Sequence, residues 1–267
     1  LFYGQYARIN SFWENSDLAA AVGLPSEKEL KLLSPLKSDL PSDVLTENAL
    51  MAPVSGTRPM DRANLRKANA MLDSAGWIVG DDGLRRNADG DTLKIEVIED
   101  SAAFDRIVLP FVENMKAAGI DAKYNRIDPA QYTDRTRNYD FDIITDQFPM
   151  SYEPSSGLKQ YFGSETADDS VFNSMGLKSK AVDKLIEHVV AAENKSDLKI
   201  AVKALDRTLR AYNFWIPQWY NDQHRVAYWD MYEHPEKIAP YDLGYLDYWW
   251  YNEDKARALK DAGFLSQ

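Results

Sequence analysis

The chain has 267 residues, of which 45% are hydrophobic and 27% are charged, a composition typical of globular proteins that can bury a substantial core. Its formal net charge of −11 argues against a nucleic-acid or anionic-membrane partner, because such partners need a basic surface. The absence of cysteine excludes disulfides, thiolate metal sites and cysteine nucleophiles, and no apolar run approaches the roughly 20 residues of a membrane-spanning helix.

The first predicted helix begins near Pro25. Ser26 has the character of an N-cap, and Glu29 stands three positions later, as in a capping box. The chain then reads as an extended polar connection, because prolines interrupt it too often for regular structure. These prolines are Pro35, Pro41, Pro53 and Pro59.

A helix is predicted over Asp61–Ala75, whose apolar residues recur at helical spacing. It ends at Gly76, and two later segments end in the same Ala-Gly-apolar pattern at Gly119 and Gly263. A glycine just after a helix, followed by an apolar residue, turns the chain back onto the helix. The pattern therefore predicts a shared stop signal for three helices.

The middle of the chain alternates between predicted strands and helices. Asp-Gly pairs between 80 and 91 indicate hairpin turns, and their spacing does not fit an EF-hand calcium loop. Strand, helix, strand, helix, strand is typical of a mixed sheet with covering helices, an α/β fold. The predicted strands are Thr92–Glu99, Asp121–Ile127 and Phe141–Thr145, and the helices are Phe104–Ala118 and Asp128–Tyr132.

Two amphipathic helices are predicted next, Ala181–Ala192 and Asp197–Tyr212, with Ser196 as the N-cap of the second. A short strand at Arg225–Trp229 and a last helix from about Glu253 to Ala262 complete the elements.

The segment from Tyr139 to Leu158 is the first place to expect function. A strand rich in β-branched residues leads into an aromatic stretch stiffened by Pro149 and Pro154. Loops that follow buried strands often carry ligand-contacting groups in α/β proteins. The alternative is an ordinary surface loop that covers a core edge.

Few other residues suggest chemistry. Arg135 and Arg137 could clamp a carboxylate or could lie on a solvated face. Trp219 lies in an aromatic stretch suited to a cleft lining, although most aromatic residues simply pack in a core. Scattered histidines and the absence of HExxH, GxSxG, GxGxxG and P-loop motifs predict no metal site, cofactor or catalytic centre.

Several stretches together resemble the C-terminal part of the family 5 extracellular solute-binding proteins, in particular their YejA-like oligopeptide-binding branch. They cover most of the chain and keep their order and spacing. These stretches are LFYGQYARINSFWENSDLAA, KANAMLDSAGW, ENMKAAGIDAKYNRIDPAQY, YDFDI, KAVDKLIEHVVAA, ALDRTLRAYNFWIPQWY and HRVAYWDMYEHPEKIAPYDLGYLDYWWYNEDKARALKDAGF.

The resemblance implies the C-terminal lobe of a periplasmic binding protein type II-like (cluster C) fold. It implies a segment from the other lobe with an extended connection over 1–60, a ligand-binding lobe over 61–230, and an aromatic segment returning to the other lobe over 231–267. The family has two lobes, about twice this length and an export signal. We therefore expect a fragment of an exported protein.

The resemblance also implies a function without catalysis. The whole protein would capture an oligopeptide or peptide-like solute between its lobes and deliver it, as a periplasmic monomer, to the ABC permease of the inner membrane. Several relatives carry an aspartate that binds the peptide amino group, where this chain has Met150. The ligand-binding residues expected are Arg135, Arg137, Gln147, Phe148, Met150, Ser151, Tyr152 and Trp219.

Two alternatives remain open at this point. One is a hydrolytic enzyme that uses acidic residues around 140–153, such as Asp142 and Asp146. The other is a nickel or haem carrier, since the wider family includes such members.

Overall fold

A computed structural model describes residues 4–18, 20–56, 60–169, 171–238, 240 and 242–265. Within these, the chain forms two compact units. The first takes its residues from 9–14 and 18–217, and the second from 4–8, 15–17 and 218–265. Pro59 lies outside the described residues, as do the first three residues of the stretch that opens the chain. No helix among the described residues is long and apolar enough to cross a membrane.

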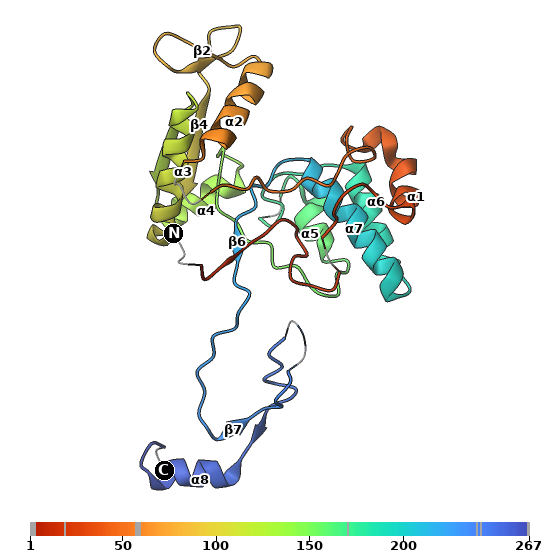
Figure 1. The fold of residues 1–267 in the computed structure, drawn as a ribbon, viewed down its shortest axis with the longest axis vertical. Coiled ribbons are helices and arrows are strands. Elements are labelled where there is room, and N and C mark those ends of the chain that lie inside the picture. The colour runs from red at the N-terminus through yellow and green to blue at the C-terminus, as the bar shows by residue number, and fades with distance from the viewer. Residues whose placement is uncertain are drawn as a thin grey trace. The chain divides into compact units, whose positions relative to one another are not determined.

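In the first unit, strands β4 (Lys94–Glu99) and β5 (Asp121–Arg126) form a two-stranded parallel sheet (Figure 1). The short η2 (Ala102–Phe104) and helix α3 (Asp105–Ala117) connect them, as parallel strands require. The apolar face of α3 packs on the strands. The buried residues where α3 meets the strands are Val97, Val108, Val112, Met115 and Ala122.

The predicted third strand, Phe141–Thr145, is wrong as a full strand. Only Ile143 pairs with β4, through a parallel bridge to Val97, with Ile98 N–H donating to Ile143 O at 3.1 Å. The side chain of Asp142 accepts the N–H of Glu96 at 2.7 Å, a position where a strand would offer a backbone carbonyl. The side-chain bond therefore replaces the ladder on this edge of β4.

The shared helix stop signal is confirmed. The N–H groups of Trp77, Ile120 and Phe264 reach back to the carbonyls of Leu72, Met115 and Leu259 at 3.0, 3.1 and 3.0 Å. The preceding glycines have φ of 84°, 85° and 77°, where a side chain is strained. These bonds close α2 (Arg62–Ser74), α3 and, in the second unit, α8 (Glu253–Asp261).

The Asp-Gly region forms turns, as predicted. The strands β2 (Ile78–Val79) and β3 (Arg85–Arg86) make a hairpin whose loop closes with Gly83 N–H to Gly80 O at 2.9 Å. Arg85 is buried and donates to the carbonyl oxygens of Trp77 and Ala118 and to the carboxylate of Asp73. One guanidinium thereby connects the ends of α2 and α3.

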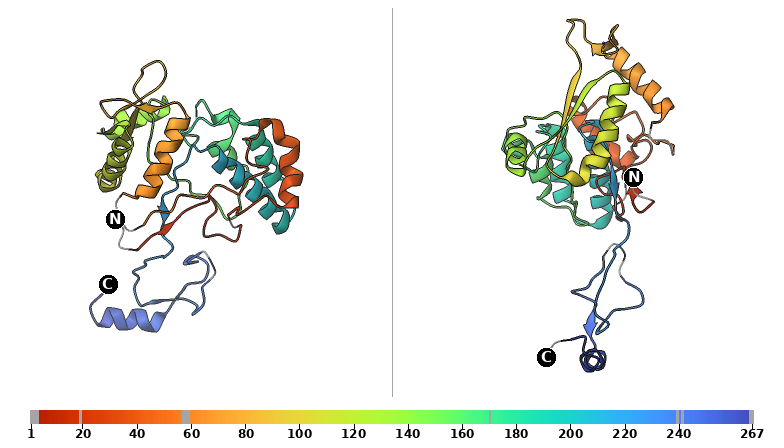
Figure 2. Two further views of the ribbon diagram at one scale, coloured as in Figure 1. Left: turned by 45° about the horizontal axis from the view of Figure 1, so that its top comes forward. Right: turned by 90° about the vertical axis from the view of Figure 1, so that its left-hand side faces the viewer.

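The regular elements in the rest of the first unit are helices joined by long loops (Figure 2). Ser26 and Glu29 form the predicted capping box of α1 (Glu27–Leu33). The proline-rich connection is not wholly irregular, since the 3-10 helix η1 (Ser34–Asp39) begins beside Pro35, which suits its first turn. The remaining helices are α4 (Pro129–Arg137), α5 (Leu158–Phe162), η3 (Ser164–Thr166), α6 (Lys180–Val190) and α7 (Lys195–Ala211).

Helix α7 starts before the predicted position. Asn194, not Ser196, is its N-cap, because the Asn194 side chain accepts the N–H groups of Ser196 and Asp197. Its apolar face packs against α6, and buried residues of the second core include Val182, Leu185 and Leu205.

Charged residues of α7 are buried and hold the N-terminal segment. Asp206 is fully buried and accepts from Ser11 Oγ at 2.8 Å, Phe12 N–H at 3.1 Å, Ala21 N–H at 3.2 Å and Arg210 at 2.8 Å. Because Asp206 is paired with Arg210, the buried charge of each is compensated inside the core.

The second unit is built from short strands. β1 (Ala7–Arg8) pairs with β6 (Trp219–Tyr220), and β7 (Tyr232–Glu233) pairs with β8 (Trp250–Tyr251), ahead of α8. The predicted strand Arg225–Trp229 is wrong. Among the described residues it has no strand partner, and Tyr228 instead packs its ring against Trp249, with centroids 4.6 Å apart. Tyr241 lies outside the described residues.

Candidate functional site

The carboxyl end of β4 gathers polar groups that reach the predicted ligand segment. Glu99 is buried, and its carboxylate accepts the N–H groups of Asp100 at 3.1 Å and Ser101 at 3.0 Å and contacts the hydroxyl of Thr145. Tyr132 of α4 donates its hydroxyl to the carbonyl of Thr145 at 3.2 Å. These bonds fix the chain where it leaves the sheet.

The Tyr132 hydroxyl is held in its protonated form. Burial raises the pKa of Tyr132, and the negative charges of Glu99, Asp146 and Asp100 raise it further. Tyr132 is thus a neutral donor at any physiological pH, and its role is to position the backbone.

Asp146 begins the segment itself. Its carboxylate accepts the N–H of Gln147 at 2.7 Å and the hydroxyl of Ser174 at 2.6 Å. With Asp142 bonded to the backbone of Glu96, both acids proposed for a hydrolase serve the local structure. Among the described residues, no group of three His, Cys, Asp or Glu side chains is arranged to hold a metal ion.

Two of the predicted site residues anchor the segment in the core. The ring of Phe148 lies 5.3 Å from that of Phe12, edge to face, and 5.9 Å from that of Phe162, stacked. Met150 is partly buried against the same core, and its N–H donates to Phe148 O at 2.9 Å. Buried Pro154 ends the segment.

The residues on either side of these anchors are exposed. Gln147 and Ser151 are open to solvent, and Tyr152 is 47% exposed. The Ser151 hydroxyl accepts the N–H of Glu153 at 3.0 Å, which closes a local turn. Exposed and anchored positions thus alternate along 147–150, and Ser151 and Tyr152 are both exposed.

Much of this backbone is unpaired within the described chain. No acceptor there takes the N–H of Ile144, Phe148 or Ser151, and no donor reaches the carbonyl of Gln147 or Met150. Such groups need a partner from water or a ligand, since unpaired buried backbone is costly. The segment therefore offers a row of main-chain donors and acceptors.

Arg135 is already engaged. Its guanidinium donates to Glu96 at 2.6 Å and to the carboxylate of Asp140 at 2.9 Å, and its side chain is only 17% exposed. The bond from Arg135 is the main reason that the pKa of Glu96 lies below its usual value. A ligand carboxylate would have to displace one of these acids, and the assignment of Arg135 stays a prediction.

Arg137 belongs to α4 of the first unit, and Trp219 belongs to the second unit. Arg137 is exposed and lines a shallow depression of about 600 Å³ with Asp169 and Phe172. Trp219 is half-buried in β6 of the second unit, opposite Arg8. Their ligand-binding roles also stay predictions.

Sequence reasoning did not identify Glu99, Tyr132 and Thr145 as the group that holds the segment. The available signal was an acidic residue at the last position of the predicted strand Thr92–Glu99, followed directly by Asp100 and Ser101. Tertiary contacts with Tyr132 and Thr145, which lie 33 and 46 positions further on, leave no such local pattern.

Residues 2–169 match the family model of the bacterial extracellular solute-binding proteins, family 5. The chain is 38% identical over 251 residues to a protein from Agrobacterium fabrum named probable peptide-binding protein YejA, covering 94% of this chain and 41% of that protein. It is 35% identical over 263 residues to the uncharacterized protein YejA of Escherichia coli, covering 98% of this chain and 43% of that protein.

A similar fold occurs in the oligopeptide-binding protein AppA of Bacillus subtilis, solved with a nonapeptide. The two are 16% identical with a TM-score of 0.53, and the match covers 94% of this chain and 53% of AppA. The α/β fold expected from the resemblance is confirmed. The chain spans about two fifths of the length of the curated relatives named above.

Three findings agree with the fold expected for this family. They are the parallel β4–β5 pair with its crossover helix, the anchored segment after Ile143, and the match to the family model. The chain belongs to the bacterial extracellular solute-binding proteins of family 5.

Proposed function

We propose that the protein containing this chain is the solute-binding component of an ABC importer, and that it captures an oligopeptide or peptide-like solute. Residues 147–152 form one wall of the cleft. The ligand is not altered chemically; it is released to the permease in the inner membrane. The protein acts as a monomer in the periplasm.

The observation that carries this proposal is the row of unpaired backbone groups from the N–H of Ile144 to the N–H of Ser151. A peptide in extended conformation carries a matching row of N–H and carbonyl groups. Because main-chain bonds do not depend on side chains, such a wall accepts many sequences. The names of the relatives from Agrobacterium fabrum and Bacillus subtilis are consistent with this ligand class.

Because residue 150 is methionine, this position has no charged group to bind the amino group of a peptide. The Met150 side chain packs against the core instead. We therefore expect affinity to depend on the peptide backbone more than on a free N-terminus. Closure of the cleft would follow from higher affinity for ligand in the closed form, and the closed form would be recognised by the permease.

The test uses the intact protein. Native mass spectrometry of protein purified without refolding should detect co-purified peptides, and calorimetry should give comparable affinities for a pentapeptide with a free and an acetylated N-terminus. Methylation of the backbone nitrogens of the pentapeptide should weaken binding, because it removes the donors.

A matched pair of variants tests the segment. Ser151→Pro removes one N–H donor and should weaken peptide binding about fivefold, since one hydrogen bond contributes roughly 1 kcal/mol. Ser151→Ala keeps the N–H and should bind as the parent does. Equal affinities for all three, with unchanged melting temperatures, would contradict the assignment of this wall; recovery of cleaved peptide would favour a hydrolase.

A further inference from the structure

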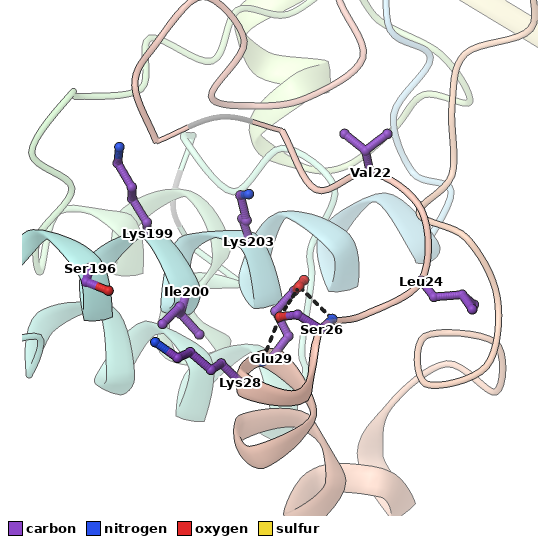
Figure 3. A pocket seen from close by; sticks show the side chains of 9 residues that line it. All are labelled: Val22, Leu24, Ser26, Lys28, Glu29, Ser196, Lys199, Ile200 and Lys203. Carbon is purple, nitrogen blue, oxygen red and sulfur yellow. Dashed lines mark hydrogen bonds between the residues drawn. The ribbon is translucent and has the colours of Figure 1, made fainter.

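A basic pocket lies between the loop before α1 and one face of α7 (Figure 3). Its volume is about 380 Å³, within the range of small-molecule sites. It is lined by Val22, Leu24, Ser26, Lys28, Glu29, Ser196, Lys199, Ile200 and Lys203. The residues from α7 follow the spacing i, i+3, i+4 and i+7, so they share one face of the helix.

The three lysines of this pocket are not neutralised within the described chain. Neither Lys28, Lys199 nor Lys203 forms an ion pair or a hydrogen bond with another described residue. The one acid in the lining, Glu29, is committed elsewhere: it accepts from the Ser26 hydroxyl at 2.7 Å and pairs with buried Arg207 at 3.2 Å. The lysine charge therefore remains uncompensated, although the chain as a whole carries −11.

The walls of the pocket are held in place from behind. Arg207 connects α7 to Glu29 of α1 and donates to the carbonyl of Gly23 at 2.8 Å, which also accepts the N–H of Ala49. Like charges at Lys199 and Lys203, four positions apart, disfavour the helix. An anion between these two lysines would offset that repulsion.

We propose that this pocket binds a phosphate-type oxyanion. Lysine is a common point-charge ligand for phosphate, and the hydroxyl of Ser196 lies on the same face. Val22 and Leu24 at the rim are 68% and 62% exposed, so the oxyanion can be part of an amphiphile. A lipid headgroup and a soluble phosphate share this chemistry; the negative overall charge limits the interaction to this local surface.

The inference does not rest on peptide binding. The first test measures the melting temperature of the intact protein in inorganic phosphate and compares it with that in sodium chloride at equal ionic strength. The second test measures co-sedimentation of the intact protein with vesicles of phosphatidylglycerol and phosphatidylcholine, and compares it with vesicles of phosphatidylcholine alone. The variant Lys199→Gln/Lys203→Gln is compared with Lys67→Gln/Lys180→Gln, which removes the same charge from exposed positions on α2 and α6.

The parent and the control should respond to phosphate, to anionic vesicles or to both. The pocket variant should lose about 30-fold in affinity at low salt, since each lysine near an anionic group contributes about 1 kcal/mol. Its melting temperature without anion should not fall, which shows that it folds. A response to phosphate alone identifies a soluble anion, and a response to anionic vesicles alone identifies a headgroup. Equal losses in both variants, or no response in the parent, would overturn the proposal.

Discussion

Asp206 shows how a single buried carboxylate can organise a large part of the chain. It accepts hydrogen bonds from Ser11, Phe12, Ala21 and Arg210, and therefore holds the segment that begins at residue 9 against α7. Arg210 in turn donates to the carbonyl oxygens of Ala21 and Leu50. Breaking such a pair leaves a buried charge without compensation.

Asp206→Asn should therefore lower the free energy of unfolding by about 3–5 kcal/mol. The amide presents a donor to groups that are themselves donors, and Arg210 loses its counter-charge. Urea denaturation followed by fluorescence measures the change. Asp197→Asn, in the exposed first turn of the same helix, is the control and should cost less than about 1 kcal/mol. Similar midpoints for both variants would contradict the role of Asp206.

Glu96 gives a prediction about pH. Its pKa is lowered, chiefly by the hydrogen bond from Arg135, so its ionised form is favoured in the folded state. The resulting stability is present above the usual pKa of 4.5 and is lost as pH falls through the lowered folded value. Melting temperatures between pH 6 and pH 3 should therefore decline less steeply in Glu96→Gln than in the parent. Glu113→Gln, at an exposed surface pair, should follow the parent curve.

At the scale of elements, local patterns predicted helices well because their signals are short-range. The capping box at Ser26 and the three glycine stops were readable, since each depends on residues within one turn. The sequence predicts a full strand at Phe141–Thr145, whereas the structure has a single bridge there. Its pairing depends on the Asp142 side chain meeting Glu96, 46 positions earlier in the chain.

The same limit applies to the candidate site. The segment 147–152 could be located from its prolines and aromatic residues, but which of its residues would anchor it could not. Phe148 packs on Phe12 and Phe162, and Arg135 meets Glu96; neither contact leaves a mark in the local sequence.

Two glycine stops provide a matched comparison at this scale. Gly76 and Gly119 have nearly the same φ, 84° and 85°, so an added side chain costs about 1 kcal/mol of strain at either. A Cβ at Gly76 meets nothing within 4 Å, whereas one at Gly119 lies 3.0 Å from the Gly83 carbonyl oxygen and from Arg85 Cγ. Gly119→Ala should be more destabilising than Gly76→Ala by about 1 kcal/mol or more in urea denaturation. Equal costs would mean that the hairpin and Arg85 move aside freely.

At the scale of the whole molecule, the chain spans about two fifths of the length of its curated relatives, and a cleft between lobes needs both walls. The wall that we propose for 147–152 would offer backbone bonds on one side of a ligand only. Each tenfold in affinity corresponds to about 1.4 kcal/mol, so the loss of half of the contacts is expected to be severe.

We therefore predict that the 267-residue chain alone binds a pentapeptide at least about 100-fold more weakly than the intact protein, by calorimetry under identical conditions. A circular dichroism melt of the isolated chain must show a cooperative transition, so that weak binding reflects the missing wall and not unfolding. The peptide should be recovered uncleaved from both samples by mass spectrometry. Tight binding by the chain alone would place the whole site within these residues and contradict a cleft shared between lobes.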